Sequence, residues 1–252
     1  MSPKISVAIP TYTKGLTEVN YLRECFNTIS KQSFKNYEVI VSDNSSHSLV
    51  YELYEEYIQY FPSISYFKNL EHIGMSANSN FAMQKCKGEY IKILHCDDLL
   101  YSTDALKIIV DNLDTTDSYW LVNGFNHTTD GLNFFDPRVP RYPKHLLIGN
   151  NLIGCPTNIT IKKSGLEYYD ENIHMGMDVE WYHRIRMKYG MPLILENILT
   201  TSRITNNNTT SKINLDILVE TEEGSWENVQ SELDYIQEKH KDFFDTWEYP
   251  NG

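Results

Sequence analysis

Residues 91–100, with the sequence IKILHCDDLL, form an apolar, strand-like run that ends abruptly in two adjacent carboxylates, Asp97 and Asp98. Two neighbouring Asp side chains repel each other, so we expect a positive charge to compensate them. Divalent cations such as Mg²⁺ and Mn²⁺ supply that charge and accept oxygen ligands. A metal ion at the end of a strand can neutralise a diphosphate. The stretch therefore predicts a site for a phosphorylated ligand that needs no basic pocket.

Strand-like and helix-like patterns alternate on both sides of this run. Apolar runs typical of short buried strands cover residues 5–10, 37–42, 64–67, 89–94 and 120–125. Apolar residues at helical spacing cover residues 17–33, 49–61, 75–86 and 106–113. This alternation predicts an α/β fold with a doubly wound, mostly parallel, Rossmann-like sheet. Ligands of such sheets bind beyond the carboxyl ends of the strands, which is where the acidic pair falls.

The second half of the chain is less regular. Residues 126–142 are rich in Asp, Gly, Pro and aromatic residues, which indicates a hairpin with loops. Further patterns predict a strand at 158–162, a helix at 178–189, one or two strands within 193–201, a polar loop at 205–211 and a terminal amphipathic helix at 226–244. We therefore expect an irregular C-terminal region that ends in a helix.

Composition limits the classes of partner. The chain has 252 residues, 41% of them hydrophobic, and a formal net charge of −12. Nucleic-acid binding needs clustered Lys and Arg, so we do not expect a nucleic-acid partner. The four cysteines form no CxxC pair, which is typical of reduced thiols in a cytosolic protein.

No targeting or membrane-spanning segment is expected from the sequence. The N-terminal residues enter a strand pattern at once, which is unlike a signal peptide. Apolar runs stay shorter than the roughly 20 residues of a membrane span. We therefore predict a cytoplasmic protein without a transmembrane segment, and peripheral contact with a membrane is compatible with this prediction.

Polar residues follow three of the predicted strands and should meet at one sheet edge. These residues are Thr11-Tyr12, Asp43-Asn44 and Asp97-Asp98. Asp43 has two interpretations: its carboxylate can accept the N–H of a pyrimidine base, or it can cap the next helix.

The cluster His95-Cys96-Asp97-Asp98 also has competing interpretations. His and Cys can bind Zn²⁺, but a tetrahedral site needs further spaced ligands, and we find none. Coordination by Asp97, completed by diphosphate oxygens and water, requires fewer assumptions. Alternatively, Asp98 caps the helix that follows.

Two residues of the second half can carry chemistry. Asp178 falls just before or within the first turn of a predicted helix, where it is either a general base or a carboxylate favoured by the helix dipole. Arg203 precedes the polar loop and is either a phosphate clamp or a surface charge.

Taken in order, these segments resemble the family 2 glycosyltransferases of the GT-A fold. The matching segments are Pro10-Thr11-Tyr12, residues 41–46 around Asp43, residues 74–80 from Gly74 to Asn80, and His95-Cys96-Asp97-Asp98 at the position of the family's DxD motif. The resemblance covers residues 4–115 closely and residues 154–211 more loosely. The order and spacing of four segments make it specific to the family.

The resemblance implies a role for each matching position. Asp97 is the implied ligand of Mn²⁺ or Mg²⁺ and Asp98 its support, His95 and Cys96 lie along the ribose and diphosphate, and Asp43 contacts the base. The implied donor site is completed by Pro10, Thr11, Tyr12, Gly74, Asn80 and Arg203. Asp178 is the implied catalytic base.

These roles imply an inverting transfer of a sugar from a nucleoside-diphosphate donor, a UDP- or dTDP-sugar rather than a GDP-sugar. The implied acceptor is a hydroxyl on a glycan or a lipid-linked molecule, as in polysaccharide or glycan synthesis. Residues 1–115 are expected to bind the nucleotide-sugar, residues 116–213 to form the acceptor-binding and catalytic half of the same domain, and residues 214–252 a helical extension.

Three positions depart from the family pattern and keep an alternative open. His95 replaces the first acid of DxD, Met177 replaces the Glu before Asp178, and Thr205 replaces a His. These changes favour a non-catalytic nucleotide-sugar-binding module. A sugar nucleotidyltransferase is a weaker alternative, because residues 11–15 supply only one Lys and one Gly where a Gly-rich basic loop is needed.

Overall fold

The structure, a computed structural model, describes residues 2–144, 146–148, 151–205 and 226–245. Within these ranges the chain forms one nine-stranded sheet in the order β3-β2-β1-β4-β8-β6-β9-β5, and β7 pairs with the second half of β6. The strands are β1 (Ile5–Thr11), β2 (Tyr37–Asp43), β3 (Ile64–Lys68), β4 (Tyr90–Ile93), β5 (Leu99–Leu100), β6 (Trp120–Thr128), β7 (Phe134–Arg138), β8 (Ile159–Lys162) and β9 (Leu193–Arg203).

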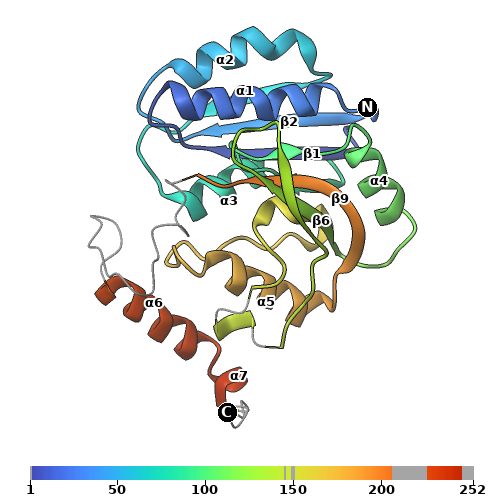
Figure 1. Ribbon diagram of the computed structural model, residues 1–252. Helices are drawn as coiled ribbons and strands as arrows, with labels where there is room; N and C mark the ends of the chain where they lie inside the picture. The colour runs from blue at the N-terminus through green and yellow to red at the C-terminus, as the bar shows by residue number, and fades with distance from the viewer. Residues whose placement is uncertain (1, 145, 149–150, 206–225, 246–252) are drawn as a thin grey trace.

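Helices cover both faces of this sheet (Figure 1). One face carries α1 (Leu16–Ser30), α2 (Leu49–Tyr57) and α4 (Ala105–Leu113), and the other carries α3 (Met75–Lys85) and α5 (Met177–Tyr189). The chain ends in α6 (Trp226–Lys239) and α7 (Lys241–Asp245), which lie beside α5, away from α1 and α2 (Figure 1). The layers are therefore helix, sheet and helix.

The alternation of side chains along β1 explains the two cores. Ile5, Val7 and Ile9 pack with the helices α1, α2 and α4, whereas Ala8 packs on the α3 and α5 side. Successive side chains of a strand point to opposite faces, so a strand covered on both sides must be apolar throughout. This requirement produces the continuous apolar runs that mark the strands in the sequence.

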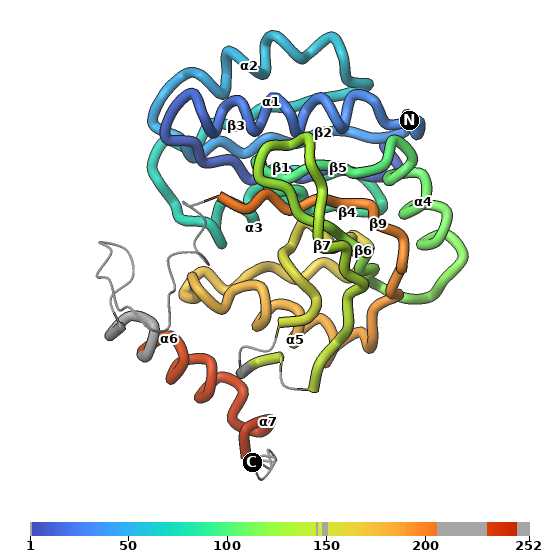
Figure 2. The backbone as a smooth tube through the Cα atoms, viewed as in Figure 1, coloured from blue at the N-terminus to red at the C-terminus, as the bar shows by residue number. Residues whose placement is uncertain are grey.

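The predicted α/β fold with a mostly parallel sheet is confirmed. The longer ladders, β1 with β2, β2 with β3 and β6 with β9, are parallel. Two features differ from the simple alternation. Strand β8 lies antiparallel between β4 and β6, and the two residues that follow the acidic pair form β5, which pairs antiparallel with the end of β9 (Figure 2).

The second half of the chain follows the predicted elements with adjusted bounds. β6 and β7 form the expected hairpin, and residues 193–203 form a single long strand. The predicted terminal helix is divided into α6 and α7, and residues 206–211 of the predicted polar loop lie outside the described residues. In the described ranges, each helix falls short of the length and apolar character needed to cross a bilayer.

Candidate active site

The ends of β1 and β2 meet at the predicted edge. Thr11 lies opposite Asp43 in parallel register, and the Asn44 N–H donates to the Thr11 carbonyl oxygen at 2.8 Å. Asn78 of α3 joins both strand ends: its Nδ2 donates to the same carbonyl at 3.2 Å, and its Oδ1 accepts the Ser42 hydroxyl at 2.5 Å. A buried amide with all these partners fixes the strand ends as one rigid rim.

A pocket of about 440 Å³ opens beside this rim. Its walls are Tyr12 after β1, residues 44–46 after β2 and residues 68–72 at the end of β3. Tyr12 is 45% exposed, and its ring stands edge-on to His72 with 4.9 Å between centroids. A concave pocket of this size with an aromatic wall suits a small planar ligand.

Asp43 is fully buried next to this pocket. Its Oδ1 accepts the Ser45 N–H at 2.8 Å, and its Oδ2 accepts the Tyr66 hydroxyl at 2.6 Å and Lys68 Nζ at 2.8 Å. A carboxylate offers about four acceptor positions, so these three bonds leave room for one more. The contact between Asp43 and a base stays a prediction.

His95, Asp97 and Asp98 come together just beyond the end of β4. Their ligand atoms lie within 4.8 Å of one another. Burial lowers the pKa of His95, which favours the neutral imidazole that a metal requires, and its Nε2 is buried without a hydrogen-bond partner in the described part of the chain. A carboxylate suits Mg²⁺ or Mn²⁺, and an imidazole nitrogen suits a transition-metal ion. The cluster can therefore hold a divalent cation.

Asp98 is engaged by the protein itself. Its Oδ1 accepts the backbone N–H of Arg203 at 2.8 Å, and its Oδ2 accepts the Thr157 hydroxyl and, at 3.7 Å, the Cys155 thiol. Burial, together with the charge of Asp97, raises the pKa of Asp98. Asp98 thus ties the end of β9 to the short 3₁₀ turn η3 (Pro156–Asn158), a geometry that suits the supporting role predicted for it.

Arg203 is buried against α1. Its Nε donates to the Asp97 carbonyl oxygen at 3.0 Å, its NH2 group pairs with Glu24, and its guanidinium lies 4.3 Å from the ring centroid of Tyr21. These contacts hold the acidic loop in place through its backbone. A direct contact between Arg203 and a diphosphate stays a prediction.

Asp178 lies in the first turn of α5, which begins at Met177 after Gly176. Its Oδ1 accepts the Val179 N–H at 2.8 Å, and its Oδ2 accepts Asn151 Nδ2 at 3.0 Å. Burial raises the pKa of Asp178 to about 6. A carboxylate with a pKa close to neutrality is suited to general base catalysis.

Residues 151–157 connect the acidic cluster to Asp178. At one end, the amide of Asn151 donates to Asp178 and its Oδ1 accepts the Gly154 N–H at 3.1 Å. At the other end, the same segment reaches Asp98, as described above. The two predicted chemical groups are therefore held by opposite ends of one short segment.

The other predicted donor-site residues occupy varied positions. Pro10 is buried opposite β2, and Gly74 precedes α3 with a φ of 80°, which a side chain would disfavour. Burial raises the pKa of the Cys96 thiol, so it stays protonated. Asn80 donates to the Tyr169 carbonyl oxygen at 3.0 Å and accepts the Tyr169 N–H at 2.8 Å, so its amide anchors the approach to α5. Its predicted donor contact stays untested.

Sequence reasoning missed three residues that build the site. Asn78 joins the strand ends, Asn151 holds Asp178, and Lys92 of β4 donates to the Thr157 carbonyl oxygen at 2.5 Å and to Asn123 Oδ1 at 2.9 Å. Burial lowers the pKa of Lys92 to about 7. A Lys inside an apolar strand was a visible signal, because a buried ammonium needs polar partners. The two Asn residues carry no such signal.

A curled, mostly parallel sheet with a strand-end pocket and an acidic cluster beyond the neighbouring strand defines the GT-A class of α/β fold. The profile of the family described as "Glycosyl transferase family 2" matches residues 6–170. The chain belongs to this family, which places it among the glycosyltransferases. The resemblance found in the sequence is confirmed.

A curated relative agrees with this assignment, and solved structures show a similar fold. The chain is 30% identical over 204 residues to an uncharacterized glycosyltransferase of Rickettsia typhi, covering 74% of this chain and 60% of that protein. Its fold is similar to that of S. aureus TarS 1–349 in complex with UDP, with 17% identity, a TM-score of 0.63 and coverage of 81% of this chain and 61% of that chain.

The fold is also similar to that of the mannosyltransferase PcManGT from Pyrobaculum calidifontis in complex with GDP-Man and Mn²⁺. The identity is 15%, the TM-score is 0.63, and the match covers 84% of this chain and 60% of that chain. This chain thus spans about three fifths of the length of the Rickettsia relative and of the two solved chains.

Proposed function

We propose that the chain is an inverting glycosyltransferase that moves a sugar from a nucleoside-diphosphate donor to an acceptor hydroxyl. The observation that carries this proposal is the segment 151–157, which joins the acidic cluster at Asp98 to the partly buried carboxylate of Asp178. One base suffices for a single displacement with inversion, whereas double displacement adds a carboxylate nucleophile.

The donor half supplies a binding site for the nucleoside. The pocket beside Tyr12 has an aromatic wall and is lined by Asn44 and Lys68, which adjoin the buried Asp43; we propose that a base enters it and donates an N–H to the remaining acceptor position of that carboxylate. A uracil or thymine ring carries such an N–H, which supports a UDP- or dTDP-sugar. The solved neighbours bind UDP in one case and GDP-Man in the other, and the panel of nucleotide-sugars described below distinguishes these donors.

Asp97, with the imidazole of His95 beside it, is the group that would hold a divalent cation. Asp98 is already bonded to Arg203 and Thr157, so it contributes by fixing the loop. When bound, Mn²⁺ or Mg²⁺ supplies positive charge that stabilises a diphosphate leaving group.

Asp178 performs the proton transfer in this proposal. With a pKa of about 6 its carboxylate is mostly ionised at neutral pH, and it can accept the proton of an acceptor hydroxyl as that oxygen attacks the anomeric carbon. The adjacent Met177 is buried, and its Sδ accepts the Ser76 hydroxyl at 3.4 Å. The position where the family has a Glu is thus used for packing, which leaves Asp178 as the base.

The proposed acceptor is a hydroxyl of a glycan or of a lipid-linked molecule, and the proposed setting is polysaccharide or glycan synthesis. Residues 116–213 are proposed to bind it, because this part of the chain carries Asp178 and the segment 151–157. Residues 1–115 are proposed to bind the donor.

Titration of UDP by calorimetry, with and without Mn²⁺, tests the donor site. We expect Mn²⁺ to strengthen UDP binding to the wild-type protein, and Asp97→Ala to abolish that dependence. Asp111→Ala on α4 is the matched control, because that carboxylate is exposed and paired only with Lys107 among the described residues. Metal-dependent UDP binding that is unchanged in Asp97→Ala would contradict the metal assignment.

A panel of UDP-, dTDP- and GDP-sugars tests the reaction itself. A glycosyltransferase releases the free nucleoside diphosphate from its donor, slowly to water and faster to an acceptor. Release of pyrophosphate would instead indicate nucleotidyl transfer, and the absence of any metal-dependent turnover would favour a binding module.

A further inference from the structure

The helix α6 docks on the turn that leads into α5. The Glu232 carboxylate accepts three consecutive backbone N–H groups, those of His174 at 3.0 Å, Met175 at 2.7 Å and Gly176 at 2.7 Å. Groups at the start of a helix have no partner within the helix, and Gly176 offers no side chain to cap them. Glu232, more than fifty positions downstream, therefore binds the N–H of the N-cap residue Gly176 and the two N–H groups of the turn before it, a contact that we call the cap of α5.

Packing holds Glu232 at this position. Ile236, one turn later on α6, is 2% exposed and belongs to the core on the α5 side of the sheet. A Cβ added to Gly176 would lie 3.0 Å from the Ile236 Cδ1 atom, so the absence of a side chain at Gly176 allows the close approach. The cap and the apolar contact thus lie on one face of α6.

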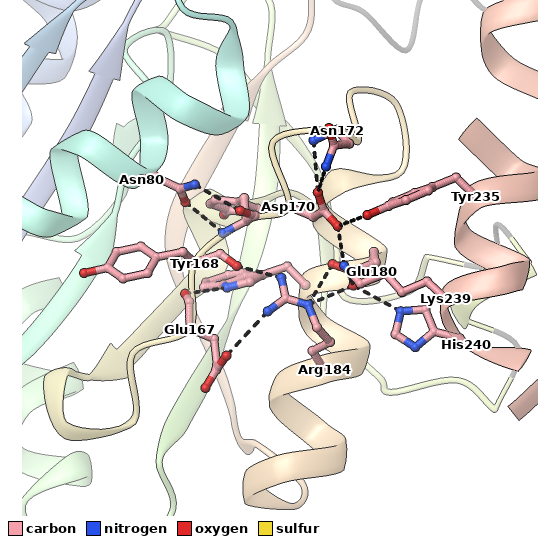
Figure 3. A network of polar contacts seen from close by, with 12 residues as sticks. Asn80, Glu167, Tyr168, Asp170, Asn172, Glu180, Arg184, Tyr235, Lys239 and His240 are labelled. Atoms are coloured by element: carbon pink, nitrogen blue, oxygen red, sulfur yellow. Dashed lines mark hydrogen bonds and ion pairs between the residues drawn. The ribbon is translucent and has the colours of Figure 1, made fainter. Parts of the chain in front are cut away.

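A charged network fixes the same pair of helices further along (Figure 3). Glu180 of α5 has a fully buried side chain that meets Arg184 Nε at 2.8 Å, Lys239 Nζ at 2.9 Å and His240 Nε2 at 3.0 Å. Burial alone would raise the pKa of Glu180, but its bonds to His240, Arg184 and Lys239 lower it to about 2. Lys239 also pairs with Asp170, in the segment before α5. Two sets of contacts therefore fix α6 against α5.

The capped turn and Asp178 are two residues apart. The direction of the Asp178 carboxylate is set by the Val179 N–H of the same helical turn and by Asn151. A rotation or shift at Gly176 would therefore move the carboxylate relative to the segment 151–157 and the acidic cluster. Misplacement of a catalytic group by about 1 Å can cost on the order of 100-fold in rate.

We propose that Glu232 is a positioning residue for catalysis: by capping α5 from α6, it holds the helix turn that carries Asp178. This inference rests on the proposed function of Asp178 as the base. Glu232 acts through three backbone N–H groups and contacts no reacting atom. The helical extension is then a part of the catalytic apparatus.

The test compares Glu232→Ala, Glu232→Gln and Glu238→Ala in metal-dependent release of UDP from the best UDP-sugar of the panel. Glu232→Ala should lower kcat by roughly 10- to 100-fold while the donor KM changes by less than about twofold. Glu232→Gln should recover most of kcat, because its amide oxygen can still accept the Met175 and Gly176 N–H groups. Glu238 is an exposed carboxylate on the same helix, and its replacement should change nothing.

Calorimetric titration with UDP and Mn²⁺ separates positioning from general damage. UDP affinity that is retained in Glu232→Ala, with kcat lost and then rescued by Gln, supports the proposal. The proposal is overturned if the kcat of Glu232→Ala equals that of the control Glu238→Ala. It is also overturned if kcat and UDP affinity fall together in Glu232→Ala and Glu232→Gln restores neither. Asp178→Asn in the same assay tests the underlying function: if it retains kcat, the proposed base is wrong, whatever Glu232→Ala does.

Discussion

The proposed donor edge, formed by Thr11, Asp43 and Asn78, and the proposed catalytic helix, α5 with Asp178, are held in place by different means. At the donor edge, Thr11 and Asp43 are neighbours because the parallel strands β1 and β2 pair in register. Asn78 of α3 holds the two strand ends together. Asp178 instead depends on a bond from Asn151 and on a cap from Glu232, two side chains that come from separate parts of the chain.

This difference predicts how the two regions fail. Backbone pairing holds the donor edge, so a substitution there should weaken nucleotide binding without disturbing Asp178. Side-chain bonds hold the catalytic helix, so a substitution there should reduce turnover while nucleotide binding persists. Each of the following experiments tests whether this separation is real.

Asp178→Asn should produce the largest effect. Removing a general base typically lowers the rate by about 100- to 10,000-fold, and we expect a loss of transfer in this range. UDP binding should stay at the wild-type value, because Asn preserves the size of the side chain and the amide oxygen can still accept the Val179 N–H. Steady-state kinetics and calorimetry on the same preparation measure both quantities.

Asp111→Asn on α4 is the control, since it makes the same chemical change at an exposed carboxylate. Transfer at a near wild-type rate in Asp178→Asn would mean that another residue is the base. Loss of UDP binding in this variant would show that the two regions are not separable.

The pH dependence of transfer should show an intermediate effect. The pKa of Asp178 is raised above the usual Asp value to about 6, because burial disfavours its charged form. A base must be ionised, so kcat/KM should be constant above this pKa and fall about tenfold per pH unit below it. UDP titrations over the same pH range separate this fall in kcat/KM from changes in donor affinity. If kcat/KM falls only below the ordinary Asp pKa, Asp178 is solvated or is not the base.

The donor edge was predictable because its information is local. Apolar runs end where strands end, and the polar residues that follow, such as Tyr12 and Asp97, must lie at one edge of a parallel sheet. Strand β5 was not predictable, because two residues are too few to show the alternating pattern of a strand. The insertion of β8 between β4 and β6 was not predictable either, because strand order is a long-range property.

The support of the catalytic helix was hidden for a further reason. Glu232 lies on an amphipathic helix among other polar residues, and its partners are backbone N–H groups, which every sequence has. Its pattern is therefore that of an ordinary exposed Glu. Asn80 also has partners that the sequence does not reveal: its amide is bonded to the backbone of Tyr169, and its implied donor contact stays a prediction.

Tyr12→Ala should produce the smallest effect and tests the donor edge alone. The ring forms an aromatic wall of the pocket with His72 beside it, and such contacts contribute about 0.5–1.5 kcal/mol, or roughly twofold to tenfold in the Kd of UDP. Tyr101→Ala is the matched control, since Tyr101 is 47% exposed against 45% for Tyr12 but packs on Phe134 of the hairpin. Because Asp178 is held by α6 and Asn151, kcat at saturating donor should be unchanged in both variants. Equal UDP affinity in the two variants would contradict the proposal that the nucleoside binds in this pocket. A loss of kcat in Tyr12→Ala would show that the donor edge also positions the catalytic helix.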